Sequence, residues 1–456
     1  MNKGAADQVE LIREVFGYQT RFEDSTMVFK IDFAVTEDPG FAMLMQDLAL
    51  LARTGFRVVI VPGAKEMIDL VLGEYGISSR FAGSHRITPA PAMPFVEMAA
   101  FHVATRFMTG LASGSPVRDG RVDAVIGTFV RARGLGIVDG VDMEHTGQVD
   151  RVFTESIDRI LKLGMIPILP CIGWSPVGKP YNVPSDEIAL AVAGALGAVK
   201  LFIISARGGI RRGMLPIPES IKTSDQGQVI RLTPQEAESL LEHAAAGTAG
   251  TAPNEAVLAE LRLALRASRA GVERIHMIDG REAGAVLREL FSNQGAGTMV
   301  YADEYESIRP LREADIPGVL RLMEPLMREG ILIRRTAEDI RDRLGDYLVY
   351  EIDGSVHACG ALHDRGENQG EIAAIATDPA YSDMGLGSRV VRRLIDRAED
   401  RGLGRVFVLT TRTHDWFEFL GFQEASLESL PVERQQSYDR TRNSMVFALD
   451  ISRDEP

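Results

Sequence analysis

The chain has 456 residues, of which 45% are hydrophobic and 25% charged, values typical of a globular protein with room for two or three domains. Its 64 acidic and 50 basic residues give a formal net charge of -14, which argues against a nucleic-acid-binding surface but not against small anionic ligands. Because Cys171 and Cys359 are the only cysteines, we expect no disulfide framework, no cysteine-based metal site and a reducing, cytoplasmic location.

The N-terminal segment predicts a helix with one apolar stripe, formed by Val9, Ile12, Val15 and Phe16. It lacks the uninterrupted apolar core of a signal peptide, and no run in the chain approaches the ~18–20 apolar residues of a membrane span. The stripe suits docking on its own domain or a contact between subunits. The stripe alone does not decide between these two readings.

The first 300 residues alternate between strand-like and helix-like segments. Apolar runs typical of buried strands lie at 25–31, 57–62, 165–170, 200–205 and 274–278. Segments with apolar residues at helical spacing lie at 41–54, 65–75, 187–196 and 255–270. This order predicts an α/β domain, with an open, mostly parallel sheet sandwiched by helices.

The texture of the sequence changes near residue 300, where a Gly-rich strand end passes into an acidic stretch. We place a linker at 301–306, between a first domain at 1–300 and a second at 307–456. A strand at 307–310 and an apolar helix from Ile316 open the second domain. Its length of roughly 150 residues suits one small α/β domain.

A glycine-containing loop is the most informative feature of the second domain. An apolar strand at 371–377 leads into this loop, which carries Gly385 and Gly387 and opens onto an amphipathic helix. Glycines let the backbone approach a pyrophosphate, and the free N–H groups of a helix start point at it. On spacing alone, an ordinary strand-to-helix turn explains the loop equally well.

The elements that follow decide between these readings. A strand at 405–411 and a short aromatic helix at 415–422 complete an order that resembles the GCN5-related N-acetyltransferase family. The resemblance implies that the glycine loop grips the pyrophosphate of coenzyme A, while the strand backbone binds its pantetheine arm. The implied residues are Ile375, Ala376, Thr377, Gly385 and Gly387. Ser382 stands where the family usually has Gln or Arg, which removes one phosphate contact at most.

Five segments resemble the N-acetylglutamate synthase family more closely: 325–335, 358–362, 370–376, 408–417 and 430–444. Together they span essentially the whole second domain. The resemblance implies an acyltransferase that moves acetyl from acetyl-CoA, its co-substrate, to the α-amine of L-glutamate in the first step of arginine biosynthesis. No metal and no permanently bound cofactor are implied.

Glutamate is a dianion with a protonated amine, so the acceptor site needs cations and a base. The resemblance places Arg335 at one carboxylate, and Arg442 with Ser444 at the other, where an arginine fork can pair two oxygens. Glu371 is the candidate general base, and its place at the start of an apolar strand predicts a raised pKa. Solvated surface charges are the alternative reading of Arg335, Arg442 and Glu371.

Three further residues concern the fate of the thiolate. Thr410 is the candidate donor to the tetrahedral intermediate or to the leaving sulfur, and a strand threonine chosen for β propensity is its alternative reading. Tyr438 is the competing acid. Cys359 lies in a buried-looking strand, so we interpret it as a core residue and predict direct transfer rather than an acyl-cysteine.

The first domain resembles the amino-acid kinase fold and the N-acetylglutamate kinase family, at 61–65, 134–140, 181–189, 200–210 and 291–300. Both phosphate turns of an active kinase are altered, to KIDF at 30–33 and PGA at 62–64. Asp32 would repel a phosphate, and bulkier residues hinder the close backbone approach that glycine permits. The resemblance therefore implies a kinase-inactive domain. It also implies a homo-oligomer, because domains of this fold usually dimerise through their sheets, and the N-terminal helix could join dimers; dimer, tetramer and hexamer all stay open.

In such two-domain synthases the first domain is a regulatory module that binds arginine as a feedback effector. The matching effector positions are His276, Glu289 and Gly295, where a carboxylate could pair a guanidinium. A core histidine and a solvated helix glutamate are the alternative readings. An acetyltransferase for another amine, a bifunctional synthase–kinase and an arginine sensor without activity stay open as other functions.

Overall fold

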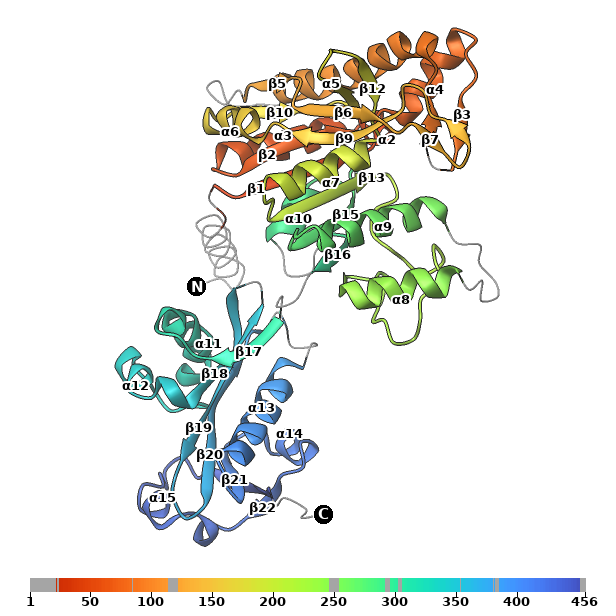
Figure 1. Ribbon diagram of the computed structural model, residues 1–456. Coiled ribbons are helices and arrows are strands. Elements are labelled where there is room, and N and C mark those ends of the chain that lie inside the picture. The colour runs from red at the N-terminus through yellow and green to blue at the C-terminus, as the bar shows by residue number, and fades with distance from the viewer. Residues whose placement is uncertain are drawn as a thin grey trace. The chain divides into compact units, whose positions relative to one another are not determined.

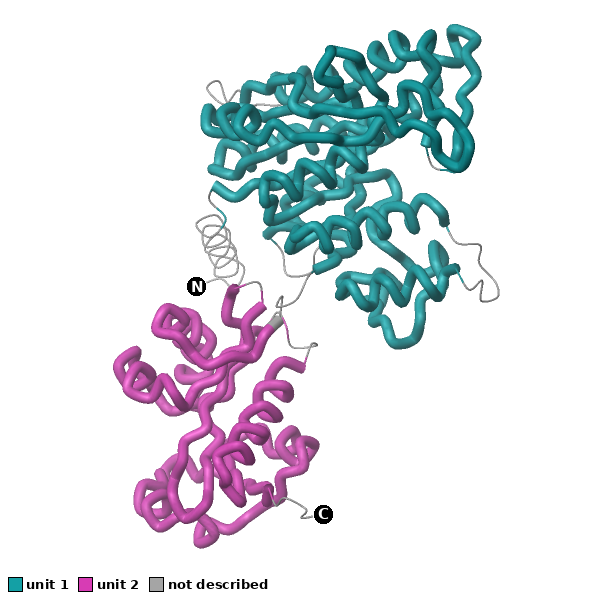
Figure 2. Tube along the Cα trace, viewed as in Figure 1, with its two compact units in different colours: residues 1–303 teal, residues 304–456 magenta. Residues whose placement is uncertain are grey.

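The structure is a computed structural model (Figure 1). It describes residues 22, 24–83, 85–113, 122–245, 254–291, 296–301, 306–352, 354–379, 381 and 385–451. The predicted N-terminal helix and Gly295 lie outside these residues. The chain divides into two compact units, residues 1–303 and 304–456 (Figure 2). None of the described helices combines the length and the apolar character that crossing a membrane requires.

Unit 1 is built on an eight-stranded sheet in the order β14-β16-β15-β13-β1-β2-β10-β5. The strands are β1 (Thr26–Ile31), β2 (Arg57–Pro62), β5 (Ala124–Ile126), β10 (Ile166–Ile168), β13 (Lys200–Ser205), β14 (Arg231–Leu232), β15 (Arg274–Asp279) and β16 (Thr298–Tyr301). All neighbours are parallel except β15 and β16. The predicted open, mostly parallel sheet is therefore confirmed.

Helices cover both faces of this sheet. Successive side chains of a strand point to opposite faces, so each strand contributes to two hydrophobic cores. Met27, Phe29 and Ile31 of β1 pack in one core, and Val28 packs in the other. The first core includes α3 (Phe41–Arg53), α4 (Lys65–Glu74), α5 (Met93–Ser113) and α10 (Ala285–Phe291). The second includes α6 (Thr154–Lys162), α7 (Ser185–Ala195), α8 (Pro234–Ala245) and α9 (Glu255–Arg269).

Unit 1 also has a smaller sheet that the sequence did not predict, in the order β12-β11-β6-β9. Its strands are β6 (Val130–Gly134), β9 (Gly147–Val152), β11 (Ile172–Trp174) and β12 (Pro180–Asn182). Two hairpins and a short helix complete the unit: β3 (Arg80–Ala82) with β4 (His85–Ile87), β7 (Ile137–Val138) with β8 (Val141–Asp142), and α2 (Phe33–Thr36).

Unit 2 has a seven-stranded sheet in the order β17-β18-β19-β20-β21-β23-β22. The strands are β17 (Glu306–Pro310), β18 (Tyr347–Ile352), β19 (Ser355–Asp364), β20 (Gln369–Thr377), β21 (Arg405–Thr410), β22 (Gln423–Ala425) and β23 (Met445–Asp450). One face packs on α11 (Ile316–Arg328) and α12 (Ala337–Arg341), and the other on α13 (Leu386–Asp400) and α14 (His414–Phe419). Helix α15 (Val432–Gln436) precedes β23.

The sheet of unit 2 opens between β20 and β21, its one parallel pair. These strands pair only from Gln369 to Glu371 on one side and from Arg405 to Phe407 on the other. Beyond Glu371, the β21-facing edge of β20 has no strand partner within the described part of the chain. A bulge against β19 lies in the same stretch, where Ala374 has a φ of 57°. This opening exposes backbone N–H and C=O groups of β20 that a ligand can use.

Candidate active site

A cavity of about 90 Å³ in unit 2 brings together four of the predicted site residues. Arg335, Glu371, Arg442 and Ser444 all line it, with Tyr438 beside them. They come from segments far apart in the sequence. The loop before α12 carries the first, and β20 carries the glutamate at its last pair with β21. The segment between α15 and β23 carries the others.

Glu371 is buried and clamped by two arginines. Arg434 of α15 reaches its two oxygens with Nε at 3.0 Å and Nη2 at 3.1 Å. Arg365 adds a bond from Nε at 2.7 Å. Burial alone would raise the pKa of Glu371, but the hydrogen bonds and charges of Arg434 and Arg365 outweigh it and hold the pKa below its usual value. The predicted raised pKa is therefore wrong, because the sequence did not show these partners.

Arg335 and Arg442 keep their charges available to a ligand. Among the described residues, neither forms an ion pair with a carboxylate. Arg442 donates from Nη2 to the carbonyls of Ile331 at 2.8 Å and Gly330 at 3.2 Å. Arg335 donates from Nη1 to the carbonyl of Ile333 at 3.3 Å. The charged residues that line the cavity are three arginines, Arg335, Arg434 and Arg442, and two carboxylates, Glu371 and Asp439, so its lining is net positive, as an anionic acceptor requires.

The two candidate acids lie in different surroundings. Tyr438 lines the cavity, and its hydroxyl donates to the carbonyl of Ser444 at 2.6 Å. Thr410 does not line it. Its Oγ1 accepts the N–H of Thr413 at 3.1 Å and shares a 2.8 Å hydrogen bond with the hydroxyl of that residue. This contact closes the turn from β21 into α14, so Thr410 has a structural task in this conformation.

The residues predicted to bind coenzyme A lie at the opening of the sheet. Ile375, Ala376 and Thr377 form the end of β20, beyond its last pair with β21. Gly385 precedes α13 with a φ of 65°. A Cβ built on Gly387 would lie 3.2 Å from Cγ2 of Thr377, so strand end and helix start are in contact.

The start of α13 leaves backbone donors unpaired by side chains. It has no side-chain cap among the described residues, so its first N–H groups are free to meet an anion.

His276 and Glu289, two predicted effector residues, are paired in unit 1. Nδ1 of His276 on β15 lies 2.7 Å from Oε1 of Glu289 on α10, and both side chains are buried. The other carboxylate oxygen accepts the N–H groups of Ala296 and Gly297. Burial alone would raise the pKa of Glu289, but its bond to His276 outweighs burial and lowers it. A solvated glutamate is therefore the wrong reading of this residue.

Two family models match the chain. Residues 33–214 match the amino acid kinase family, and residues 316–422 match the acetyltransferase (GNAT) family. The amino-acid acetyltransferase of Azotobacter vinelandii is 35% identical over 447 residues, which cover 97% of this chain and 99% of the relative. That of Pseudomonas aeruginosa is 33% identical over 451 residues, which cover 98% and 100%. The chain belongs to the amino-acid acetyltransferase family.

Solved structures agree with this membership. N-acetylglutamate synthase of Neisseria gonorrhoeae, in complex with coenzyme A and L-arginine, matches with a TM-score of 0.83 and 31% identity. A second structure of that synthase, with coenzyme A and N-acetyl-glutamate, matches with a TM-score of 0.58 and 32% identity. Each match covers 98% of this chain and 99% of the other. The chain is an acyltransferase, and the predicted pairing of a kinase-like fold with an acetyltransferase fold is confirmed.

Arg434 and Arg365 are the site residues that sequence reasoning missed. Arg434 lies within the segment at 430–444 that carries the family resemblance, but it stands 63 positions from Glu371. Arg365 follows the end of β19 and reaches Glu371 across the turn that leads into β20. A buried carboxylate in a strand implies a cationic partner, and this signal could have prompted the search.

Proposed function

We propose that the chain is an N-acetylglutamate synthase, which transfers acetyl from acetyl-CoA to the α-amine of L-glutamate. The supporting observation is the cavity at the opening between β20 and β21, where Arg335 and Arg442 offer guanidinium groups that no described carboxylate occupies. A dicarboxylate suits this lining better than a basic or neutral acceptor. We also propose that the first domain spans residues 1–300, the linker 301–306 and the second domain 307–456.

The reaction forms a C–N bond at the thioester carbonyl and breaks the C–S bond. Arg335 holds one carboxylate of glutamate, while Arg442 and Ser444 hold the other. The pantetheine arm of coenzyme A lies along the backbone of Ile375–Thr377, and its pyrophosphate lies at the start of α13, near Gly385 and Gly387.

Glu371 takes the proton of the α-ammonium, directly or through a water. Its low pKa keeps it ionised but makes it a weak base, so the amine gives up its proton more readily as the pH rises. After the attack the nitrogen loses its second proton as the C–S bond breaks. The coenzyme A thiolate receives a proton from Thr410 or Tyr438, and the second proton of the nitrogen restores that hydroxyl through water, so that one proton in all is released. Tyr438 is favoured because it lines the cavity, and Thr410 because it ends β21, the strand that faces β20 across the opening of the sheet.

Arginine is the proposed feedback effector of unit 1, at His276 and Glu289, with Gly295 as the third position. Both oxygens of Glu289 already have hydrogen-bond partners. A contact between Glu289 and the guanidinium group of arginine therefore requires one of these hydrogen bonds to break. A cytoplasmic location and a homo-oligomer stay predictions from the sequence.

Thiol release from acetyl-CoA by the full chain tests the proposal. We expect turnover with L-glutamate but not with L-aspartate, L-glutamine or L-lysine, and a change in rate when L-arginine is added. Arg335→Met and Arg442→Met should each raise KM for glutamate. Arg334→Met is the matched control, because Arg334 is adjacent in sequence but does not line the cavity. Equal rates with glutamine and glutamate would contradict the two-carboxylate site.

A further inference from the structure

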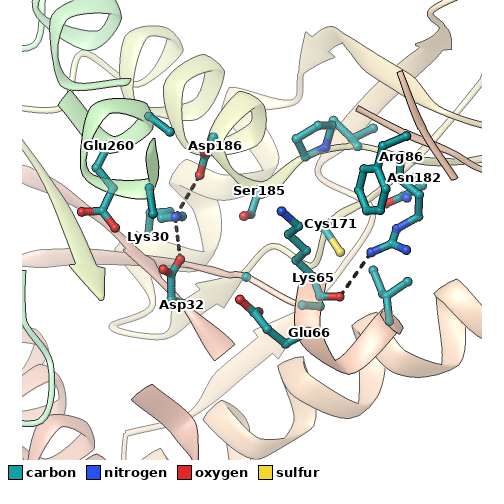
Figure 3. Close-up of a pocket in the computed structure, with 18 of the residues that line it drawn as sticks. Lys30, Asp32, Lys65, Glu66, Arg86, Cys171, Asn182, Ser185, Asp186 and Glu260 are labelled. Atoms are coloured by element: carbon teal, nitrogen blue, oxygen red, sulfur yellow. Dashed lines mark hydrogen bonds and ion pairs between the residues drawn. The ribbon is translucent and has the colours of Figure 1, made fainter. Parts of the chain in front are cut away.

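Two further cavities are lined by charged side chains, and in the first of them the cations are paired with carboxylates. This cavity, of about 330 Å³, lies in unit 1 at the carboxyl ends of β1 and β2. Lys30 bonds to Asp32 at 2.6 Å and to Asp186 at 2.9 Å (Figure 3). Arg207 bonds to Asp32 at 2.8 Å and to Glu260. Neither of these cations is therefore free for a ligand anion.

The second cavity, of about 370 Å³, lies in unit 2 and is rich in arginine. Its charged lining consists of four arginines and two aspartates: Arg334, Arg335, Arg343, Arg365, Asp339 and Asp342. Arg365 bonds to Glu371, whereas the other three arginines form no ion pair within the described residues. Four positive and two negative charges give this cavity a net positive lining, which suits an anion.

The hydroxyl of a buried tyrosine opens into this cavity without a partner. Tyr347 of β18 is only 1% exposed and lines the cavity, and its hydroxyl forms no hydrogen bond within the described residues. This hydroxyl is not one of the described polar atoms that lack both a partner and accessible surface, so a ligand in the cavity can reach it. Burial raises the pKa of Tyr347, and the nearby charges of Arg335 and Arg343 oppose this rise. Two guanidinium groups and one hydroxyl donor are therefore gathered in one part of the cavity.

His363 of β19 places a hydrogen-bond acceptor beside these donors. Its buried ring lines the cavity and lies edge-on to the ring of Tyr347, with 6.1 Å between the ring centres. Nδ1 lies 2.8 Å from Oδ2 of Asp346, and because an ionised carboxylate only accepts, Nδ1 carries the hydrogen and Nε2 keeps a lone pair. Burial lowers the pKa of His363 more than the bond to Asp346 raises it, so the ring is neutral above pH 7. Nε2 has no partner among the described residues and, like the tyrosine hydroxyl, keeps accessible surface.

A ligand for this cavity needs oxygens that accept from the arginines and the tyrosine, and one hydrogen that it donates to Nε2. Hydrogen phosphate has both, because it keeps an O–H group near pH 8, whereas sulfate has only acceptors. We propose that the cavity binds inorganic phosphate, whose oxygens accept from Arg335, Arg343 and Tyr347. Its O–H group donates to Nε2 of His363. The site is separate from the one proposed for coenzyme A, since Tyr347 packs in the core with α11 and α12, whereas α13 packs on the other face of the sheet.

Calorimetric titration of the full chain with sodium phosphate and with sodium sulfate, near pH 8, tests the site without any turnover. We expect phosphate to bind at least about tenfold more tightly than sulfate, as one hydrogen bond to a charged group implies. His363→Asn keeps a donor for Asp346 but removes Nε2, so this variant should lose the preference for phosphate over sulfate. Equal affinities of the native chain for the two anions, or no binding of phosphate, would overturn the proposal.

Two variants remove donors from the cavity. Arg343→Met and Tyr347→Phe should each weaken phosphate binding about tenfold. Arg341→Met is the matched control, because Arg341 pairs with Glu313 and does not line the cavity. Undiminished phosphate binding by both Arg343→Met and Tyr347→Phe, with unfolding temperatures near that of the native chain, would overturn the proposed site.

Steady-state rates distinguish this site from the proposed function. Arg335 also lines the acceptor cavity, so phosphate should compete with glutamate, a consequence that rests on the proposed function. In the native chain, phosphate should raise KM for glutamate in proportion to its concentration and leave kcat unchanged, and in Arg343→Met this rise should largely disappear. Phosphate binding by a chain that does not turn over glutamate would support the site and refute the proposed function. Phosphate binding to an active chain without a rise in KM would refute the part of Arg335 in the site.

Discussion

Replacing Arg434 with Met removes the bidentate partner of Glu371 while keeping most of the side-chain volume. Arg434 is 8% exposed and Glu371 5% exposed, so the change leaves a buried carboxylate with Arg365 as its only partner in the clamp. Breaking a buried ion pair typically costs about 3–5 kcal/mol. Because Arg365 remains, we expect a loss near the lower end, about 3 kcal/mol in the free energy of unfolding at pH 7.

The loss depends on pH in a defined direction. The pKa of Glu371 is lower in the folded chain than in the unfolded one. Its contribution to stability is therefore present above the unfolded pKa of about 4.3 and is lost as the pH falls through the folded pKa. The difference between the native chain and Arg434→Met should narrow on acidification over this range. With its clamp weakened, Glu371 should titrate at a higher pH in the variant, and the acid limb of the kcat/KM profile should move the same way.

Urea unfolding of a double-mutant cycle measures the pair. Arg434→Met, Glu371→Gln and the double variant should show a coupling energy well above 0.5 kcal/mol, the spread expected for independent sites. Arg412→Met is the matched control, because its ion pair with Glu329 is exposed on both sides and such pairs contribute about 0–1 kcal/mol. Additive effects of Arg434→Met and Glu371→Gln, or an acid limb that does not move, would refute the clamp.

Three further predictions concern other parts of the chain. Gly387→Leu should raise KM for acetyl-CoA several-fold with a smaller effect on KM for glutamate, because its side chain would press on Thr377; unchanged binding of coenzyme A in a fluorescence titration would contradict this. Cys359→Ala should retain most of kcat in the thiol-release assay, since burial raises the pKa of its thiol to about 12 and direct transfer needs no thiolate; loss of an acetyl-enzyme intermediate together with activity would contradict direct transfer. Glu289→Gln should abolish the rate response to arginine while leaving the rate without arginine unchanged, and an intact response would remove Glu289 from the effector site.

The main sheet of unit 1 could be predicted because its strands are buried on both faces. The apolar runs at 57–62 and 200–205 coincide with β2 and β13, where a strand between two helical layers needs no polar face. The small sheet escaped prediction for the opposite reason. Strands β11 and β12 have three residues each, which is too short for a periodic pattern.

At the site, the residue types could be predicted from the sequence, but the surroundings of each residue could not. The sequence, through its resemblance, brought forward Arg335, Glu371, Arg442 and Ser444, which the fold gathers around one cavity. It could not show the environment of Glu371, because a pKa depends on groups that only tertiary structure brings near. The strand position of this residue indicated burial correctly, but burial is outweighed by Arg434, which lies 63 positions away.

Two buried glutamates, one in each unit, differ in how fully the described residues compensate their charge. Glu371 has donors on both oxygens, so its charge is satisfied before any ligand arrives and the nearby free guanidinium groups make that cavity selective for anions. Glu260 depends on Arg207, which it shares with Asp32, and its buried Oε2 has no hydrogen-bond partner among the described residues. A buried carboxylate oxygen without a donor is unfavourable, so burial raises the pKa of Glu260 although Arg207 is beside it, whereas the two arginines outweigh burial at Glu371 and lower its pKa. The same residue type, equally buried, is therefore stabilised as an anion in unit 2 and disfavoured as an anion in unit 1.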